Sequence, residues 1–196
     1  MLEAIKLLHA QPSVILETGS SAWGTDSSRL FDDYVAGFGG EFATVDIRIG
    51  PLFRLWRDLG PRSVIACDDS VRFLRRWVQE NPGRKADLVY LDSYDLDVRS
   101  PTAAAIQALS ELEAIRPALH DGSMLLVDDT PATLDYFPEP DRTAAWRFQE
   151  RTGLIPGKGM LIDVYLRGDS TVTKILHRYQ VLYRFVASPS PGAARS

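Results

Sequence analysis

One segment near the start of the chain indicates the fold: Val14-Ile15-Leu16-Glu17-Thr18-Gly19-Ser20-Ser21-Ala22-Trp23-Gly24-Thr25-Asp26-Ser27-Ser28. An apolar run followed by a polar, glycine-containing loop is typical of a buried strand that leads into a helix. Gly19 and Gly24 let the backbone come close to a ligand, because they carry no Cβ atom. The segment lacks Gly-x-Gly-x-x-Gly and the lysine of a phosphate-binding loop. A plain turn, with Thr25 or Asp26 capping the helix, explains the same residues.

Five short apolar runs of this kind alternate with segments of helical spacing. The runs are Ser13 to Leu16, Phe42 to Ile47, Ser63 to Cys67, Asp87 to Leu91 and Ser123 to Val127. They have few polar interruptions, which is typical of strands covered on both faces. Strand–helix alternation predicts right-handed crossovers and a parallel sheet between two layers of helices.

The last third of the chain departs from this alternation. Met160 to Leu166 and Ile175 to Val186 are two extended runs, and the link through 167–170 is too short for a parallel crossover. We therefore expect an antiparallel hairpin at the edge of the sheet. The predicted fold is α/β: a Rossmann-like three-layer sandwich around a mostly parallel seven-stranded sheet with a C-terminal antiparallel hairpin.

The predicted organisation is one domain with two short additions. Residues 1–12 are expected to form an N-terminal helix that Pro12 stops, residues 13–186 the domain, and residues 187–196 a disordered tail that has little to bury. Apolar residues make up 45% of the 196 residues and charged residues 24%, which is enough for a single large core.

Charge and targeting signals exclude several classes of protein. The formal net charge of −4 argues against a general nucleic-acid binder. No apolar run is long enough to span a membrane, and no secretory signal is visible. Cys67 is the single cysteine, so an internal disulfide is excluded. We expect a cytoplasmic protein with no nucleic-acid or membrane partner. An apolar edge strand such as Val181-Leu182-Tyr183 leaves pairing between subunits, and so a homo-oligomer, open.

Acidic residues stand at the ends of successive predicted strands. Glu17 ends the first, Asp46 the second, and Asp68-Asp69-Ser70 follows the third. An acid at the tip of the second strand is placed to accept hydrogen bonds from a ribose diol. Asp69 has two readings, because it can cap the following helix or face an adenine amino group.

Glu-x-Gly-(four residues)-Gly after the first strand, Asp46 after the second and the Asp-Ser pair after the third resemble the class I S-adenosylmethionine-dependent methyltransferases. The resemblance covers about residues 12 to 186, and the antiparallel hairpin is typical of that family. It implies that Glu17 and Gly19 lie near the methionine moiety, Asp46 near the ribose, and Asp69 and Ser70 near adenine. The predicted cofactor-binding residues are Glu17, Gly19, Ser20, Gly24, Asp46, Ile47, Asp68, Asp69, Ser70, Asp92 and Tyr94.

A second group of acids follows the fourth and fifth predicted strands. Asp92 ends the fourth, and Asp128 and Asp129 end the fifth. In a parallel sheet of this order the three carboxylates converge, and they repel one another unless a proton or a cation intervenes. We favour a hard divalent ion such as Mg²⁺. The alternative is that Asp128 and Asp129 cap the next segment while Asp92 is solvated.

These acids resemble those of metal-dependent O-methyltransferases that act on catechols and macrolide sugars. The resemblance implies Asp92, Asp128 and Asp129 as metal ligands, with the cation lowering the pKa of an acceptor hydroxyl. Catechol-type enzymes have a lysine three residues after the first metal aspartate, where this chain has Asp95. Asp92 and Asp95 are therefore the predicted catalytic residues, with Asp95 or a metal-bound water taking the proton.

The sequence predicts a methyltransferase that uses S-adenosylmethionine, aided by Mg²⁺, on a hydroxyl of a small molecule or sugar. Three alternatives stay open at this point. The first is a metal-independent methyltransferase, and the second is a non-catalytic module that keeps the cofactor pocket and binds partners. The third, a nicotinamide dehydrogenase, is disfavoured by the absent Gly-x-Gly and by the edge hairpin.

Overall fold

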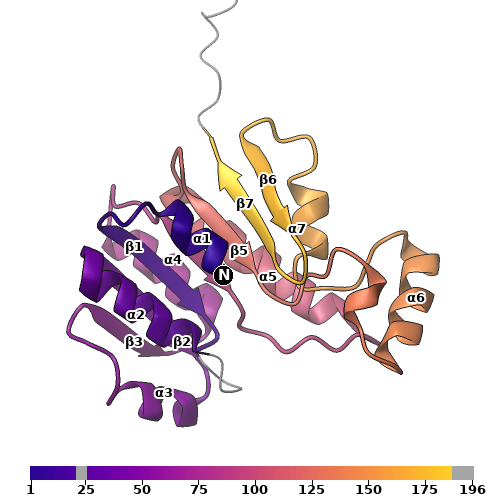
Figure 1. Cartoon of the computed structure of the whole chain (residues 1–196), viewed down its shortest axis with the longest axis horizontal. Coiled ribbons are helices and arrows are strands. Elements are labelled where there is room, and N and C mark those ends of the chain that lie inside the picture. The colour runs from indigo at the N-terminus through magenta and orange to yellow at the C-terminus, as the bar shows by residue number, and fades with distance from the viewer. Residues whose placement is uncertain (21–25, 187–196) are drawn as a thin grey trace, which may run out of the picture.

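The protein is built on one seven-stranded sheet in a computed structural model that describes residues 1–20 and 26–186 (Figure 1). The strand order is β3-β2-β1-β4-β5-β7-β6. The strands are β1 (Ser13–Thr18), β2 (Gly40–Asp46), β3 (Ser63–Cys67), β4 (Leu88–Leu91), β5 (Met124–Val127), β6 (Val172–His177) and β7 (Val181–Phe185). The predictions for Gly24 and for the tail at 187–196 concern residues outside the described ranges.

Strands β1 to β5 pair in parallel, whereas β7 pairs antiparallel with both β5 and β6. This topology confirms the predicted mostly parallel sheet with an antiparallel C-terminal hairpin. The buried positions of β4 and β5 are consecutive rather than alternating, because helices cover both faces there.

Helices lie on both faces of the sheet (Figure 1). One face packs against α1 (Leu2–Leu7) and α2 (Ser27–Phe38), through residues such as Ala4, Phe31 and Val35. The other face packs against α4 (Ser70–Glu80), α5 (Thr102–Ile115) and α7 (Met160–Tyr165). The remaining helical elements are α3 (Ile49–Leu55), α6 (Asp141–Thr152) and the 3₁₀ turns η1 (Arg116–Ala118) and η2 (Leu134–Tyr136).

The predicted strand at Met160 to Leu166 is wrong, because this segment is helix α7. Ile162 and Leu166, four residues apart, are buried in the core, while Val164 and Tyr165 between them are exposed. That spacing is helical, and the segment packs onto α5. The hairpin is therefore made by β6 and β7, with a turn at residues 178–180, and not by the two runs the sequence indicated.

The position of β7 and the end of α1 also differ from expectation. Strand β7, which contains Val181-Leu182-Tyr183, lies between β5 and β6, so it is not the edge strand that we expected for pairing between subunits. Helix α1 ends at Leu7, well before Pro12, and His9 and Ala10 then adopt positive φ angles of 55°. Ala4 and Leu8 are buried against the sheet, which makes α1 part of the same core.

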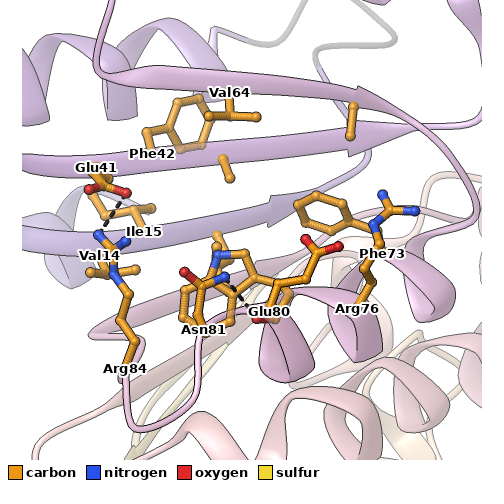
Figure 2. A pocket seen from close by; sticks show the side chains of 14 residues that line it. Val14, Ile15, Glu41, Phe42, Val64, Phe73, Arg76, Glu80, Asn81 and Arg84 are labelled. Carbon is orange, nitrogen blue, oxygen red and sulfur yellow. Dashed lines mark hydrogen bonds and ion pairs between the residues drawn. The ribbon is translucent and has the colours of Figure 1, made fainter.

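A cavity of about 290 Å³ lies between α4 and strands β1 to β3 (Figure 2). Its wall includes Val14, Phe42 and Phe73, and an ion pair of 2.6 Å between Arg84 Nη2 and Glu41 Oε2 closes one side. Val14 and Glu41 lie near the amino ends of their strands, away from the acids that the sequence singled out. Among the described residues, no helix is long and apolar enough to cross a membrane.

Candidate active site

The ends of three strands meet at Gly19, directly after β1. Its amide donates to the carbonyl of Val45 in β2 at 2.8 Å, and its φ is +85°. A Cβ atom at this position would lie 2.2 Å from the carbonyl oxygen of Asp92, which follows β4. Only glycine fits, because both the backbone angle and the close approach exclude a side chain.

A cleft of about 200 Å³ opens beside Gly19 at the carboxyl ends of the strands. In sheets of this type, ligands bind in the crevice outside those ends. The predicted cofactor residues that line it are Gly19, Asp46, Ile47, Asp69, Ser70 and Tyr94. Val45, Ser93 and Gln107 complete the wall.

Asp46 is buried at the end of β2, and Arg48 holds its carboxylate. Arg48 Nε and Nη2 each donate to one carboxylate oxygen at 3.1 Å, and the backbone amide of Arg48 donates to Oδ1 at 2.7 Å. The Asp46 hydrogen bond raises the pKa of Arg48. A ribose diol that bound to Asp46 would therefore share the carboxylate with Arg48, a partner that the sequence did not reveal.

Asp68 and Asp69 have different surroundings, although they are adjacent. Asp68 pairs with Arg72 and with Arg76, whose Nη1 lies 2.7 Å from Oδ2, and does not line the cleft. Hydrogen bonds from Arg72 are the main reason that the pKa of Asp68 is lowered. Asp69 caps α4 by accepting from the amide of Arg72 at 2.9 Å, and it also lines the cleft. Asp69 can therefore cap α4 and also face a ligand in the cleft.

Glu17 is fully buried at the end of β1. Its Oε2 accepts hydrogen bonds from Ser28 and from Thr44 Oγ1, the latter at 2.7 Å, and Thr44 is also bonded to the buried Ser20 at 2.6 Å. Burial raises the pKa of Glu17 to about 7. Within the described part of the chain, Glu17 Oε1 is a buried oxygen without a hydrogen-bond partner. Buried oxygens of this kind are uncommon in proteins.

A second buried acid, Glu111 of α5, was missed in the sequence. It accepts from Thr18 Oγ1 at 3.3 Å and from Ser93 Oγ at 2.5 Å, and so ties the ends of β1 and β4 to the helix below the cleft. Burial raises its pKa. Helical spacing alone identifies this position, because Glu111 lies three residues after Ala108 and four before Ile115, both buried.

The acids after β4 and β5 converge as expected. One carboxylate oxygen from each of Asp92, Asp128 and Asp129 lies within 4.8 Å of the others, and all three residues are partly buried. Gln180 Nε2 donates to Asp128 Oδ1 at 2.6 Å, and Tyr179 Oη donates to Asp129 Oδ1 at 2.5 Å. We call these three aspartates the acidic cluster.

Lys158 reaches into the acidic cluster from the loop before α7. Its Nζ lies 2.5 Å from Asp92 Oδ1 and 3.0 Å from Asp129 Oδ2, and the residue is only 3% exposed. Burial disfavours its charged form, but Asp92 and Asp129 together raise the pKa of Lys158 above its ordinary value. Burial likewise raises the pKa of Asp92, and Lys158 counteracts that rise. The sequence alone did not identify these carboxylates as the partners of Lys158.

The remaining predicted site residues lie at the margins. Asp95 is exposed and is not one of the three clustered carboxylates. Tyr94 is 49% exposed at the mouth of the cleft. Two aromatic residues that were not among the predicted site residues lie in the loop after β5: Phe137 is buried and anchors the loop, whereas Tyr136 is exposed with its ring centroid 6.1 Å from that of Tyr179.

Comparison with known proteins gives structural relatives only. No protein-family model and no curated protein matches the sequence. The methyltransferase MycE of mycinamycin biosynthesis, solved with Mg and SAH, superposes with a TM-score of 0.64 at 16% identity over 97% of this chain. The chain spans 49% of the length of MycE.

Two other solved structures give a similar match. The apo structure of CalS11, a TDP-rhamnose 3'-O-methyltransferase of calicheamicin biosynthesis, matches with a TM-score of 0.59 at 20% identity, over 93% of this chain and 77% of CalS11. An rRNA methylase from Streptococcus thermophilus matches with a TM-score of 0.53 at 12% identity, over 95% of both chains. The chain has the class I methyltransferase fold. Because methyltransferases of this fold include both a sugar and an rRNA enzyme, the methyl acceptor has to be argued from the site.

Proposed function

We propose that this protein transfers a methyl group from S-adenosylmethionine to a hydroxyl of a small molecule or sugar, with assistance from Mg²⁺. The observation that carries the proposal is the position of the cleft. It opens at the carboxyl ends of β1 to β4 and reaches Ser93 and Tyr94, which directly follow Asp92 of the acidic cluster. A donor site and a cation site side by side fit a transfer reaction in which the acceptor is held at the cation.

The cleft fits the donor through both shape and charge. Asp46 and Asp69 line it, and Glu17, two residues before Gly19, is buried with one oxygen that has no hydrogen-bond partner among the described residues. Carboxylates favour a positively charged ligand over a pyrophosphate. When bound, S-adenosylmethionine would supply an electrophilic methyl group on a sulfonium. Asp46 would hold the ribose hydroxyls, Asp69 and Ser70 would face the adenine, and Gly19 would leave room for the methionine part.

The acidic cluster fits a hard divalent ion, because its donors are carboxylate oxygens at mutually close positions. Mg²⁺ held there would lower the pKa of an acceptor hydroxyl. Gln180 and Tyr179 fix Asp128 and Asp129 by hydrogen bonds, which orients the oxygens toward one region. Asp92 and the exposed Asp95 are the candidates to take the acceptor's proton.

The acceptor side is supported by two exposed aromatic rings. Tyr179, in the turn between β6 and β7, donates a hydrogen bond to Asp129. Tyr136, in the 3₁₀ turn η2, packs beside the ring of Tyr179. Rings of this kind bind the apolar face of a sugar or an aromatic acceptor. A small hydroxylated acceptor also agrees with the net charge of −4, which does not favour a nucleic-acid acceptor.

The proposal is tested in two steps that separate binding from transfer. Isothermal titration with S-adenosylhomocysteine should give saturable binding to the wild type, and Asp46→Ala should weaken it at least tenfold, whereas Glu150→Gln on the exposed face of α6 should leave it unchanged. A screen of nucleotide sugars and phenols in the presence of Mg²⁺, read as formation of S-adenosylhomocysteine, should then identify an acceptor.

The outcomes distinguish the proposal from its competitors. Absence of cofactor binding would overturn it. Cofactor binding without turnover on any acceptor would favour a non-catalytic binding module. Turnover that is unchanged by a metal chelator would favour a metal-independent methyltransferase, a candidate that the Lys158 ion pairs already support.

A further inference from the structure

Lys158 is held in the acidic cluster by its backbone. The amide of Lys158 donates to the carbonyl of Asp129 at 3.0 Å, and the amide of Gly159 donates to Thr130 Oγ1 at 2.9 Å. A Cβ atom at Gly157 would lie 2.8 Å from the Asp129 carbonyl oxygen, and one at Gly159 would lie 2.7 Å from the Thr130 side chain. The two glycines therefore let the loop pack directly onto the end of β5, which aims the lysine inward.

The Lys158 ammonium lies among carboxylates whose negative charges need a counter-ion. With its three carboxylates ionised, the cluster has three negative charges in a partly buried place, and repulsion among them would separate the strand ends. The Lys158 ammonium contacts two of the three at 2.5 and 3.0 Å. It reduces the net charge of the cluster from −3 to −2.

The same two oxygens cannot serve both cations equally well. Mg²⁺ binds oxygen at about 2.0–2.1 Å in a near-octahedral shell. An ion that took Asp92 Oδ1 and Asp129 Oδ2 together would approach the Lys158 ammonium closely, since Nζ is already in contact with both atoms. Like charges at such a distance repel strongly in a partly buried site.

We propose that the Lys158 ammonium is the resident counter-ion of the acidic cluster, and that a divalent cation binds there by displacing it from Asp92 and Asp129. This inference rests on the proposed function only in naming Mg²⁺ as the cation. It gives Lys158 two states, one bound to the cluster and one released from it, with metal binding as the switch between them.

The first experiment compares Mg²⁺ binding to the wild type, Lys158→Met and Lys174→Met by isothermal titration without cofactor. Lys174, on β6, is the matched control, because its Nζ pairs with Asp163 of α7 at 2.7 Å and not with the acidic cluster. Lys158→Met should bind Mg²⁺ at least tenfold more tightly than the wild type, because the ion no longer competes with an ammonium. Lys174→Met should bind as the wild type does. Equal or weaker binding by Lys158→Met would overturn the proposal.

A second experiment uses the unchanged protein, in case Lys158→Met does not fold. Lysines are acetylated briefly with and without millimolar Mg²⁺, and the modified sites are quantified by mass spectrometry. Lys158 should be protected without the ion and should become several-fold more reactive with it, while Lys174 should react equally in both samples. Mg²⁺ binding that leaves Lys158 protected would show that the lysine stays in place, and would overturn the proposal.

Failure here and failure of the proposed function give different results. If neither the wild type nor Lys158→Met binds Mg²⁺, the displacement is overturned together with the role of the metal, while binding of S-adenosylhomocysteine in the cleft is unaffected. If the cofactor does not bind but Mg²⁺ releases Lys158, the displacement holds and the methyltransferase assignment falls.

Discussion

Replacing Glu17 by glutamine should make the stability of the protein less sensitive to pH. Glu17 is fully buried, Ser28 and Thr44 donate to one of its oxygens, and burial raises its pKa from the ordinary value of 4.5 to about 7. Glutamine has nearly the same shape, and its carbonyl oxygen can accept the same two hydrogen bonds. The variant therefore differs from the wild type mainly in being unable to ionise.

The expected size follows from linkage between protonation and folding. In the wild type, the folded state keeps the Glu17 proton between pH 4.5 and about 7, whereas the unfolded state releases it. Stability from this group is thus fully present below pH 4.5 and is lost as the pH rises through 7. The difference between the two pKa values corresponds to ~3 kcal/mol in the free energy of unfolding.

Urea denaturation followed by tryptophan fluorescence at pH 5 and pH 8 measures this effect. From pH 5 to pH 8 the free energy of unfolding of the wild type should fall by up to ~3 kcal/mol more than that of Glu17→Gln. Glu150→Gln, at an exposed position of α6, should show no such difference from the wild type. The comparison with the wild type cancels the titration of the other acids. A free-energy difference between variant and wild type that is the same at both pH values would refute the reasoning.

Three further predictions address the strand end, the core and a helix cap. Gly19→Ala should abolish binding of S-adenosylhomocysteine in a titration, because its Cβ would lie 2.2 Å from a backbone oxygen, whereas Gly37→Ala in α2, with nothing within 4 Å, should bind normally. Phe31→Ala should lower the free energy of unfolding by ~3–5 kcal/mol in urea, because the buried ring packs 5.6 and 5.9 Å from two other rings, whereas the exposed Phe53→Ala should cost less than ~1 kcal/mol. Asp69→Ala should cost ~1 kcal/mol of stability, measured by thermal denaturation, and Asp69→Asn should retain most of the cap.

The positions of the parallel strands were predictable, because their local apolar composition agrees with their burial in the folded protein. The five parallel strands begin and end within a few residues of the apolar runs, because fully covered strands need continuous apolar sequence. Met160 to Leu166 was predicted as a strand because six of its seven residues are apolar or aromatic, and a run this short is too brief for periodicity to distinguish a helix from a strand. Packing of Ile162 and Leu166 into the core determines its helical form.

The site was predictable as far as strand ends determine it. Residues that follow parallel strands share one edge of the sheet, so the convergence of Asp92, Asp128 and Asp129 follows from topology. The role of Lys158 could not be assigned in this way, because its partners depend on how the loop before α7 packs onto the strand ends, and that of Arg48 depends on how its side chain turns back onto Asp46 two residues earlier. The pairing of Asp68 with Arg72 and Arg76 was also missed, because it depends on how the first turns of α4 are oriented relative to the end of β3.

The insertion of β7 between β5 and β6 has a consequence for synthesis on the ribosome. Translation produces the five parallel strands before β7. The backbone N–H and C=O groups along the outer side of β5 therefore have no partner until β7 has been made. Until residues 181–185 leave the exit tunnel, the nascent chain offers an open template to other chains. Chaperone contact with this intermediate is expected to end only when that strand is inserted.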